Sequence, residues 1–284
     1  MSIKQHLKHG AGIVAVAGLA LALTACGSSS SSTSATTESS SEDNVITVGA
    51  SPSPHAEILE AVRDELENEG YELKIVEYND YVQPNVALSD GDLDANYFQH
   101  LPYLENYNEE NGTDLVSAAA VHFEPMGIYA GKSSDLSNVP DGAKIAVPSD
   151  ATNEARALLL LQEQGIITLK DGVGLEATAN DIQDNPHNIE LVEVEAASVA
   201  RSLEDCDFGV VNGNYALSAG LDTSATLASE SADSEAGQTY ANIVAVRNGE
   251  EESDKTKALV KALTSATAKT FIDETYQGSV ITVF

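Results

Sequence analysis

The stretch AKIAVPSDATNEARALLLLQEQ, residues 143–164, joins a strand pattern to a helix pattern and so indicates the fold class. AKIAVP is typical of a short buried strand, and residues 152–164 have the length and leucine content of a helix. Between the two lie residues of the kind that cap helix N-termini. A strand that leads directly into a helix is the repeating unit of α/β proteins.

The same alternation continues on both sides of this stretch. Helical spacing or composition occurs at residues 54–69, 81–91, 196–205 and 253–276. Extended, β-branched segments are residues 44–50, 71–78, 115–129, 189–194, 208–212 and 242–247. Strands that alternate with helices predict an α/β protein with mostly parallel sheets. A chain of this length usually folds as two lobes.

The N-terminus has the three parts of a secretory signal. Lys4 and Lys8 precede an apolar run that is too short for an ordinary membrane span, and the run ends in LTAC, residues 23–26. LTAC resembles the bacterial lipobox, in which cleavage leaves a lipid-bearing cysteine as the first residue. We therefore expect a signal peptide over residues 1–25 and lipidation of Cys26. Residues 26–43 are Ser/Thr-rich and predict a flexible tether. The alternative is an ordinary secretory signal with an incidental cysteine.

The chain is strongly acidic, with a formal net charge of −31. Such a surface argues against nucleic acid, whose phosphates require lysine and arginine. It also argues against adhesion to anionic lipid headgroups. The charge is explained by solubility of an exported protein, although one buried cation could still receive an anionic ligand.

The sequence contains no G-x-S-x-G, H-E-x-x-H, Walker or paired-cysteine zinc motif, and GVGLEA, residues 172–177, fits the dinucleotide fingerprint but does not follow an apolar strand. We therefore expect no enzyme activity and no cofactor. Past the signal peptide the histidines are His55, His100, His122 and His187, and none pairs with another at the usual spacing of metal ligands. We therefore predict no metal. A cluster of His55, His100 and His122 brought together by folding remains an alternative.

Arg156 is the strongest candidate for ligand binding in the opening stretch. Asn153 and Arg156 are three residues apart in the first turns of the expected helix, so they share one face. A guanidinium beside the free N–H groups of a helix N-terminus suits a carboxylate. The alternative is that Arg156 pairs with one of the many acidic residues.

Two asparagines follow the same logic. Asn212 comes directly after an apolar strand, at the carboxyl end where α/β proteins bind their ligands, and Asn242 opens a later strand. Their amides can both donate and accept hydrogen bonds. Ordinary turn formation explains the Asn-Gly at residues 212–213 equally well.

Several segments together resemble one known family. DANYFQHLPYL, VHFEPMGIYAGK, AVPSDATNEARALLLLQEQGIITLKDG, VEVEAASVARSLEDCDFGVVNGNYALSAGL and YANIVAVR occur in this order. With the lipobox they look like the NlpA family, the methionine-binding lipoproteins of ABC importers. The similarity spans residues 45–284, and residues 146–172 are its most specific part.

The resemblance implies a two-lobed periplasmic-binding-protein fold, similar to type 2, with a ligand cleft between the lobes. Residues 44–128 plus 239–284 would form the first lobe, and residues 129–238 the second. The resemblance assigns the ligand carboxylate to Arg156 with Asn153 beside it, and the polar end of the ligand to Asn212 and Asn242. The aromatic wall around its side chain would be formed by Phe98, His100 and Tyr103.

Three neighbouring residues are treated separately. Tyr97 is expected to face the core, and the roles of His122 and Glu124 stay open. The family likeness further implies L-methionine as ligand, with an ABC permease and ATPase as partners. It implies a monomer held by its lipid at the extracytoplasmic face of the cell membrane. The alternatives are another amino acid, an oxidised methionine, a short peptide, a metal-binding lipoprotein or a surface adhesin.

Overall fold

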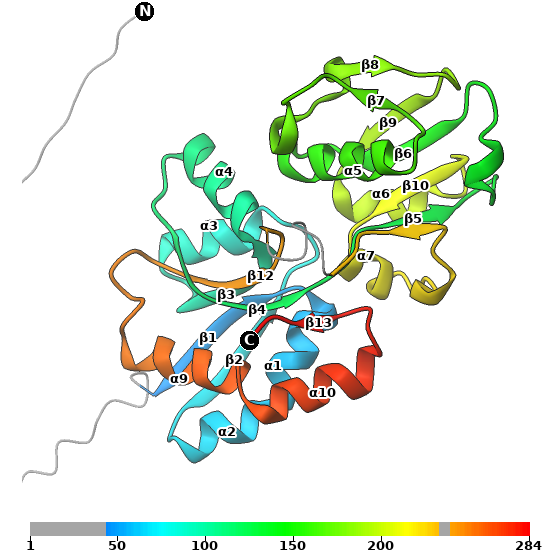
Figure 1. Cartoon of the computed structure of the whole chain (residues 1–284). Helices are drawn as coiled ribbons and strands as arrows, with labels where there is room; N and C mark the ends of the chain where they lie inside the picture. The colour runs from blue at the N-terminus through cyan, green and yellow to red at the C-terminus, as the bar shows by residue number, and fades with distance from the viewer. Residues whose placement is uncertain (1–43, 233–238) are drawn as a thin grey trace, which may run out of the picture. The chain divides into compact units, whose positions relative to one another are not determined.

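The computed structural model describes residues 44–232 and 239–284, and these contain two mixed β-sheets flanked by helices (Figure 1). All of them belong to one compact unit. The expected signal peptide, Cys26 and the tether lie outside the described residues, so they remain predictions.

The first sheet has the strand order β13-β4-β12-β3-β1-β2. Strand β1 pairs in parallel with β2 and β3, whereas β12 runs antiparallel to both β3 and β4, and β13 runs antiparallel to β4. The strands are β1 Val45–Ala50, β2 Glu72–Glu77, β3 Ala95–His100, β4 Val116–Phe123, β12 Asn242–Val246 and β13 Ile281–Thr282.

The second sheet has the order β11-β5-β10-β6-β9. Strand β6 is parallel to β9 and β10, and β5 is antiparallel to β10 and β11. The strands are β5 Gly127–Ala130, β6 Lys144–Pro148, β9 Glu190–Val194, β10 Phe208–Val211 and β11 Ala228–Ser229. A small antiparallel pair, β7 Thr168–Leu169 and β8 Ile182–Asp184, lies apart from this sheet.

The prediction of mostly parallel sheets is wrong for the strands at the two crossings. The chain leaves the first sheet at the end of β4 and enters the second with β5, and it returns from β11 to β12. Each of these four strands pairs antiparallel with its neighbours. Residues 115–129, expected as one extended run, are therefore divided between two sheets, with a short connection at residues 124–126.

The first sheet is covered on both faces. Helices α1, α2, α9 and α10 bury one core with Ile46, Val48 and Val244, and α3 and α4 bury a second with Phe98 and Ile243. The helices are α1 Glu57–Ala61, α2 Arg63–Asn68, α3 Gln83–Asp90, α4 Leu101–Asn111, α9 Asp254–Leu263 and α10 Ala266–Tyr276.

The second sheet is covered in the same way. Helix α5, Ala151–Glu163, packs Leu158 and Leu161 against Ile145 and Phe208, as the leucine-rich pattern predicted. Helices α6, Ala196–Ser202, and α7, Gly213–Ser218, bury the opposite face.

Two expected helices are each broken in the structure. Val62 (φ −104°, ψ 4°) separates α1 from α2, and Thr264 (φ −108°, ψ 20°) separates α9 from α10. At the second break the Ser265 side chain accepts a hydrogen bond from the backbone N–H of Ala268 and so begins a new helix. The apolar periodicity continues across both breaks, because the helices pack on the same core.

Strand β3 shows the alternation that determines which aromatic side chain reaches the site. Tyr97 is fully buried in the core formed with α1 and α9, and Phe98 belongs to the core on the other face. Successive side chains of a strand point to opposite faces. The expected orientation of Tyr97 is thus confirmed.

Candidate ligand-binding site

One small cavity is lined by residues of the first sheet and, on the side of the second sheet, by residues of α5 and α7 and the residue that follows β10. All seven residues that the sequence singled out are among its walls. The lining residues are Tyr81, Phe98, Gln99, His100, Tyr103, Glu124, Asn153, Arg156, Asn212, Gly213, Asn214 and Asn242.

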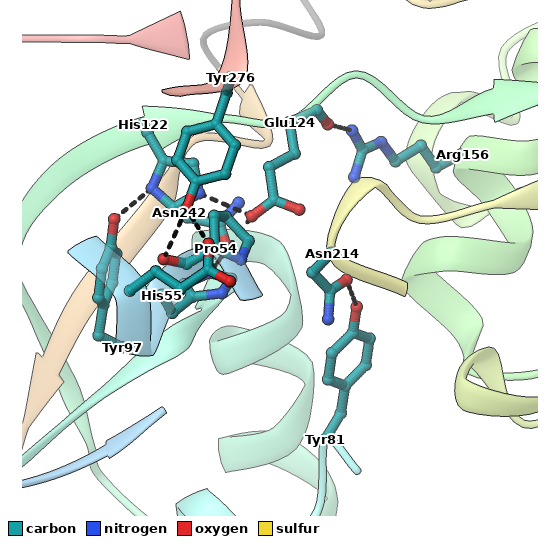
Figure 2. Close-up of polar contacts among 11 residues, drawn as sticks. Pro54, His55, Tyr81, Tyr97, His122, Glu124, Arg156, Asn214, Asn242 and Tyr276 are labelled. Atoms are coloured by element: carbon teal, nitrogen blue, oxygen red, sulfur yellow. Dashed lines mark hydrogen bonds and ion pairs between the residues drawn. The ribbon is translucent and has the colours of Figure 1, made fainter. Parts of the chain in front are cut away.

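Arg156 is paired with a buried carboxylate, that of Glu230, so the alternative in which this arginine pairs with an acidic residue is correct as far as the pairing goes. Its Nε donates to Glu230 Oε1 at 2.7 Å and its Nη2 to Glu230 Oε2 at 2.5 Å, and both side chains are almost fully buried. Nη2 also donates to the backbone oxygen of Glu124 at 2.9 Å (Figure 2). Burial alone would lower the pKa of Arg156, but the charge of Glu230 raises it on balance. Among the described residues Nη1 has no hydrogen-bond partner, and the residue lines the cavity.

Asn153 is hydrogen-bonded to residues on both sides of the cavity, and the donor and acceptor of each bond can be assigned. Its Nδ2 donates to the carboxylate of Asp150, the N-cap of α5, at 2.7 Å. Its Oδ1 must therefore accept, and it does so from Asn212 Nδ2 at 2.7 Å and from His100 Nε2 at 3.2 Å. The Oδ1 of Asn212 is left buried without a hydrogen-bond partner in the described part of the chain.

His100 lies at the junction of β3 and α4 and is a neutral donor. Its Nδ1 accepts from the backbone N–H of Tyr103 and so caps α4, which leaves Nε2–H to donate to Asn153. Burial, with Arg156 nearby, lowers the pKa of His100 to about 3. The side chain therefore contributes a hydrogen bond across the cavity, in addition to the aromatic surface expected of it.

The aromatic wall is larger than expected. Tyr81 lies near Phe98 and Tyr103, with ring centroids 5.8 and 5.7 Å away, and near Tyr215 at 4.8 Å. Its hydroxyl donates to Asn214 Oδ1 at 2.5 Å (Figure 2). The sequence pattern predicts Tyr81 as the first residue of a helix over residues 81–91, whereas α3 begins at Gln83, and no local signal marks Tyr81 as part of the site.

Glu124, whose role was left open, also lines the cavity. Its carboxylate accepts from His122 Nε2 at 2.7 Å and lies 3.4 Å from His55 Nε2 (Figure 2). Burial raises the pKa of Glu124, against the effects of His55, Arg156 and the backbone of Asn214. Gly213 is required here, because a Cβ at that position would lie 2.7 Å from Glu124 Cβ.

His55, His122 and Glu124 have the composition of a metal site, and their ligand atoms lie within 4.8 Å of one another. The predicted alternative cluster is thus partly correct, although His100 is not a member. Hydrogen bonds account for both nitrogens of His122 and for Nε2 of His55. Only Nδ1 of His55 is buried without a partner in this cluster.

Two α/β lobes that share one polar cavity define a two-lobed binding-protein fold. The chain belongs to the NlpA lipoprotein family, whose model matches residues 46–284. In residues 44–232 and 239–284, none of the helices has the length and apolar character needed to cross a membrane.

Relatives cover nearly all of the described chain. The methionine-binding lipoprotein MetQ of Bacillus subtilis is 40% identical over 279 residues, which is 96% of this chain and 97% of MetQ. A lipoprotein structure from Ruminococcus gnavus is 55% identical, with a TM-score of 0.84 over 85% of this chain and 100% of that one. A nutrient-binding protein from Burkholderia cenocepacia, solved bound to methionine, is 44% identical, with a TM-score of 0.80 over 84% and 100% of the two chains.

Proposed function

We propose that this protein is an extracytoplasmic, lipid-anchored solute-binding protein that captures methionine and delivers it to an ABC importer. The family and the methionine-binding relatives support this assignment. The protein performs no chemistry on its ligand, and its partners are a membrane permease and an ATPase.

The observation that carries the proposal is the distribution of polar groups around the cavity. Two acceptors face an ammonium group there, the unpartnered Asn212 Oδ1 and the Glu124 carboxylate, which also accepts from His122. Two donors, Arg156 Nη1 and the unpartnered Asn214 Nδ2, are available to a carboxylate. Buried polar groups left without partners are costly, so a ligand that satisfies both kinds is favoured. A zwitterionic α-amino acid supplies both.

The aromatic wall selects the side chain. Phe98, Tyr103 and Tyr81 offer ring faces and edges to an unbranched apolar group. A thioether gains about 0.3–1.5 kcal/mol from each sulfur–aromatic contact. Apolar area buried on binding adds about 25 cal/mol per Å². Methionine fits this wall better than a charged or strongly polar amino acid.

The mechanism we propose is closure of two lobes on the ligand. Residues 44–128 plus 239–284 form one lobe and residues 129–238 the other. Two hydrogen bonds support a closed state, because each joins groups from the two sets of residues: His100 Nε2 to Asn153 Oδ1, and Tyr81 Oη to Asn214 Oδ1. The importer recognises this closed form. A lipid on Cys26 keeps the monomer at the extracytoplasmic face of the cell membrane.

A different amino acid, an oxidised methionine or a short peptide is the nearest alternative ligand. A metal ion is the alternative from another class, and it rests on the ligand atoms of His55, His122 and Glu124 lying within 4.8 Å of one another. Mass spectrometry of small molecules released from the purified, undenatured protein, together with metal analysis of protein purified without chelator, separates these cases. Methionine in the released fraction supports the proposal, whereas a peptide, another amino acid or a stoichiometric metal overturns it.

A further inference from the structure

A buried polar layer lies beneath the carboxylate of Glu124 and away from the cavity. It consists of Tyr97 on β3, His122 on β4 and His55 in the short π-helix Pro52–Ala56 after β1 (Figure 2). Each of the three is 0% exposed. Of the three, none lines the cavity, so the proposed function does not use them directly.

The proton positions in this layer follow from its hydrogen bonds. The hydroxyl of Tyr97 has His122 Nδ1 as its hydrogen-bond partner, and burial raises the pKa of Tyr97 well above its usual value of 10.0. The phenol thus keeps its proton and donates it to Nδ1. In a neutral imidazole the other nitrogen then carries the hydrogen. Nε2–H of His122 consequently donates to Glu124 Oε1, at 2.7 Å.

His55 is fixed by two acceptors. Its Nε2 lies 3.0 Å from Asn242 Oδ1 and 3.4 Å from Glu124 Oε1, so this nitrogen carries the hydrogen. Its Nδ1 is buried without a partner and bears only a lone pair. A protonated ring would bury an unpaired N–H, which is costly. Burial accordingly lowers the pKa of His55 to about 4.

His55 also orients Asn242. Because Asn242 Oδ1 accepts from the imidazole, its Nδ2 group is the end left for the cavity that the residue lines. Asn242 is therefore a donor toward the ligand, while Glu124 is an acceptor. The two groups present opposite polarity, and His55 touches both of them.

We propose that Tyr97, His122 and His55 are positioning residues that give the site its polarity, by holding Glu124 as an ionised acceptor and Asn242 as a donor. This inference rests on the proposed function. Neutral N–H donors orient the carboxylate without neutralising its charge, so the charge stays available to the ligand ammonium. Arg156 differs in this respect, because its charge is already shared with Glu230.

The test compares methionine with its analogue that lacks the amino group, 4-(methylsulfanyl)butanoate. Tyr97→Phe removes only the hydroxyl that fixes His122. We expect methionine to bind about five- to ten-fold more weakly to this variant, as for loss of one buried hydrogen bond, while the affinity for the analogue stays the same. Tyr129→Phe is the matched control, because Tyr129 is buried in the core of the second sheet. An equal loss for both ligands, or no loss for either, overturns the inference.

His122 provides a second, independent series. His122→Gln keeps an acceptor for Tyr97 and a donor for Glu124, whereas His122→Leu keeps neither. The Gln variant should retain the preference for methionine over the analogue, and the Leu variant should lose it. Equal behaviour of the two variants contradicts a positioning role.

A spectroscopic readout separates this inference from the proposed function. Long-range ¹H–¹⁵N correlations of the wild-type histidines should show His122 protonated at Nε2 and not at Nδ1, and in Tyr97→Phe this preference should weaken. Protonation at Nδ1 in the wild type overturns the inference whatever the ligand. If the wild type shows the expected tautomer but binds no methionine, the proposed function fails while the arrangement of protons stands.

Discussion

The guanidinium of Arg156 and the carboxylate of Glu230 form a buried bidentate ion pair, with Nε–Oε1 at 2.7 Å and Nη2–Oε2 at 2.5 Å. Glu230 Oε2 also accepts the backbone N–H of Met126 at 2.8 Å. The residue with the strongest sequence signal for ligand binding is thus tied to both segments that connect the sheets. Its charge therefore has a buried partner within the fold.

This pair predicts that Arg156→Ala affects two separate properties. Removing the guanidinium leaves Glu230 buried and unpaired, which should lower the free energy of unfolding by about 3–5 kcal/mol. Methionine affinity should fall by at least about 2–3 kcal/mol. Urea denaturation measures the first effect and calorimetry the second.

The double variant Arg156→Ala/Glu230→Gln tests whether the two effects are independent. Neutralising the orphaned carboxylate should restore much of the lost stability, since the buried charge is gone. It should not restore binding. Recovery of methionine affinity in the double variant would show that Arg156 does not contact the ligand.

The raised pKa of Glu124 predicts that binding weakens in acid. The carboxylate must be ionised to receive an ammonium, so affinity is constant above the raised pKa and falls as the pH drops through it. The decline in methionine affinity begins at a pH above 4.5, which is the usual pKa of glutamate. For the uptake of one proton the affinity falls at most about tenfold per pH unit. Glu124→Gln should bind weakly with a flat profile over the same range. A wild-type profile as flat as that of the variant contradicts the role of Glu124.

The buried histidines predict a separate pH effect on stability. Burial is the main cause that lowers the pKa of His55 to about 4, and of His100 and His122 to about 3, from 6.5 in the unfolded chain. At pH values between the lowered pKa of each histidine and 6.5, the unfolded state binds more protons than the folded state. The contribution of these histidines to the free energy of unfolding is therefore fully present above pH 6.5 and is lost as the pH falls. The slope should reach about 4 kcal/mol per pH unit for three protons. Glu124 and Asp150 act in the opposite sense, because their pKa values are raised in the fold.

Urea midpoints at several pH values between 7 and 4 measure this slope. His100→Asn is the most informative variant, since asparagine can still cap α4 as His100 does. In this variant one fewer proton is taken up on unfolding, so the pH dependence of the free energy of unfolding should be weaker by the contribution of one histidine. An unchanged slope would show that His100 does not remain neutral in the folded protein.

The cluster of His55, His122 and Glu124 predicts little affinity for divalent metals. Tyr97 and Glu124 occupy both nitrogens of His122, which leaves the ring no free lone pair for an ion. Protein purified without chelator should contain no stoichiometric metal, and added zinc should not raise the melting temperature. Zinc-dependent stabilisation that disappears in His122→Gln would support the metal alternative instead.

Much of the site could be predicted because its residues follow strands or begin helices. Arg156 and Asn153 share a face of α5, Asn212 follows β10, and Asn242 begins β12. The ends of strands in α/β sheets converge on ligands, so local patterns made these residues candidates, although they left turn formation and acid pairing open as alternatives. Phe98, His100 and Tyr103 were identified from the family resemblance, and the structure places all three at the cavity.

The acidic partners could not be predicted in the same way. The chain has 45 aspartates and glutamates, and no local pattern distinguishes Glu124 or Glu230 among them. Glu230 is 74 residues from Arg156, and Glu124 lies in a segment that passes between two sheets. Which carboxylate lies next to which cation depends on the path of the two connections between the sheets. Hydrophobic periodicity in the sequence does not predict that path.

Methionine binding itself can be measured by calorimetric titration of the protein, freed of any co-purified ligand, with L-methionine. We expect saturable binding of one methionine per chain, with a dissociation constant between micromolar and nanomolar, about −8 to −12 kcal/mol. No saturable heat at micromolar protein, together with binding of a different solute in the same experiment, would contradict this expectation.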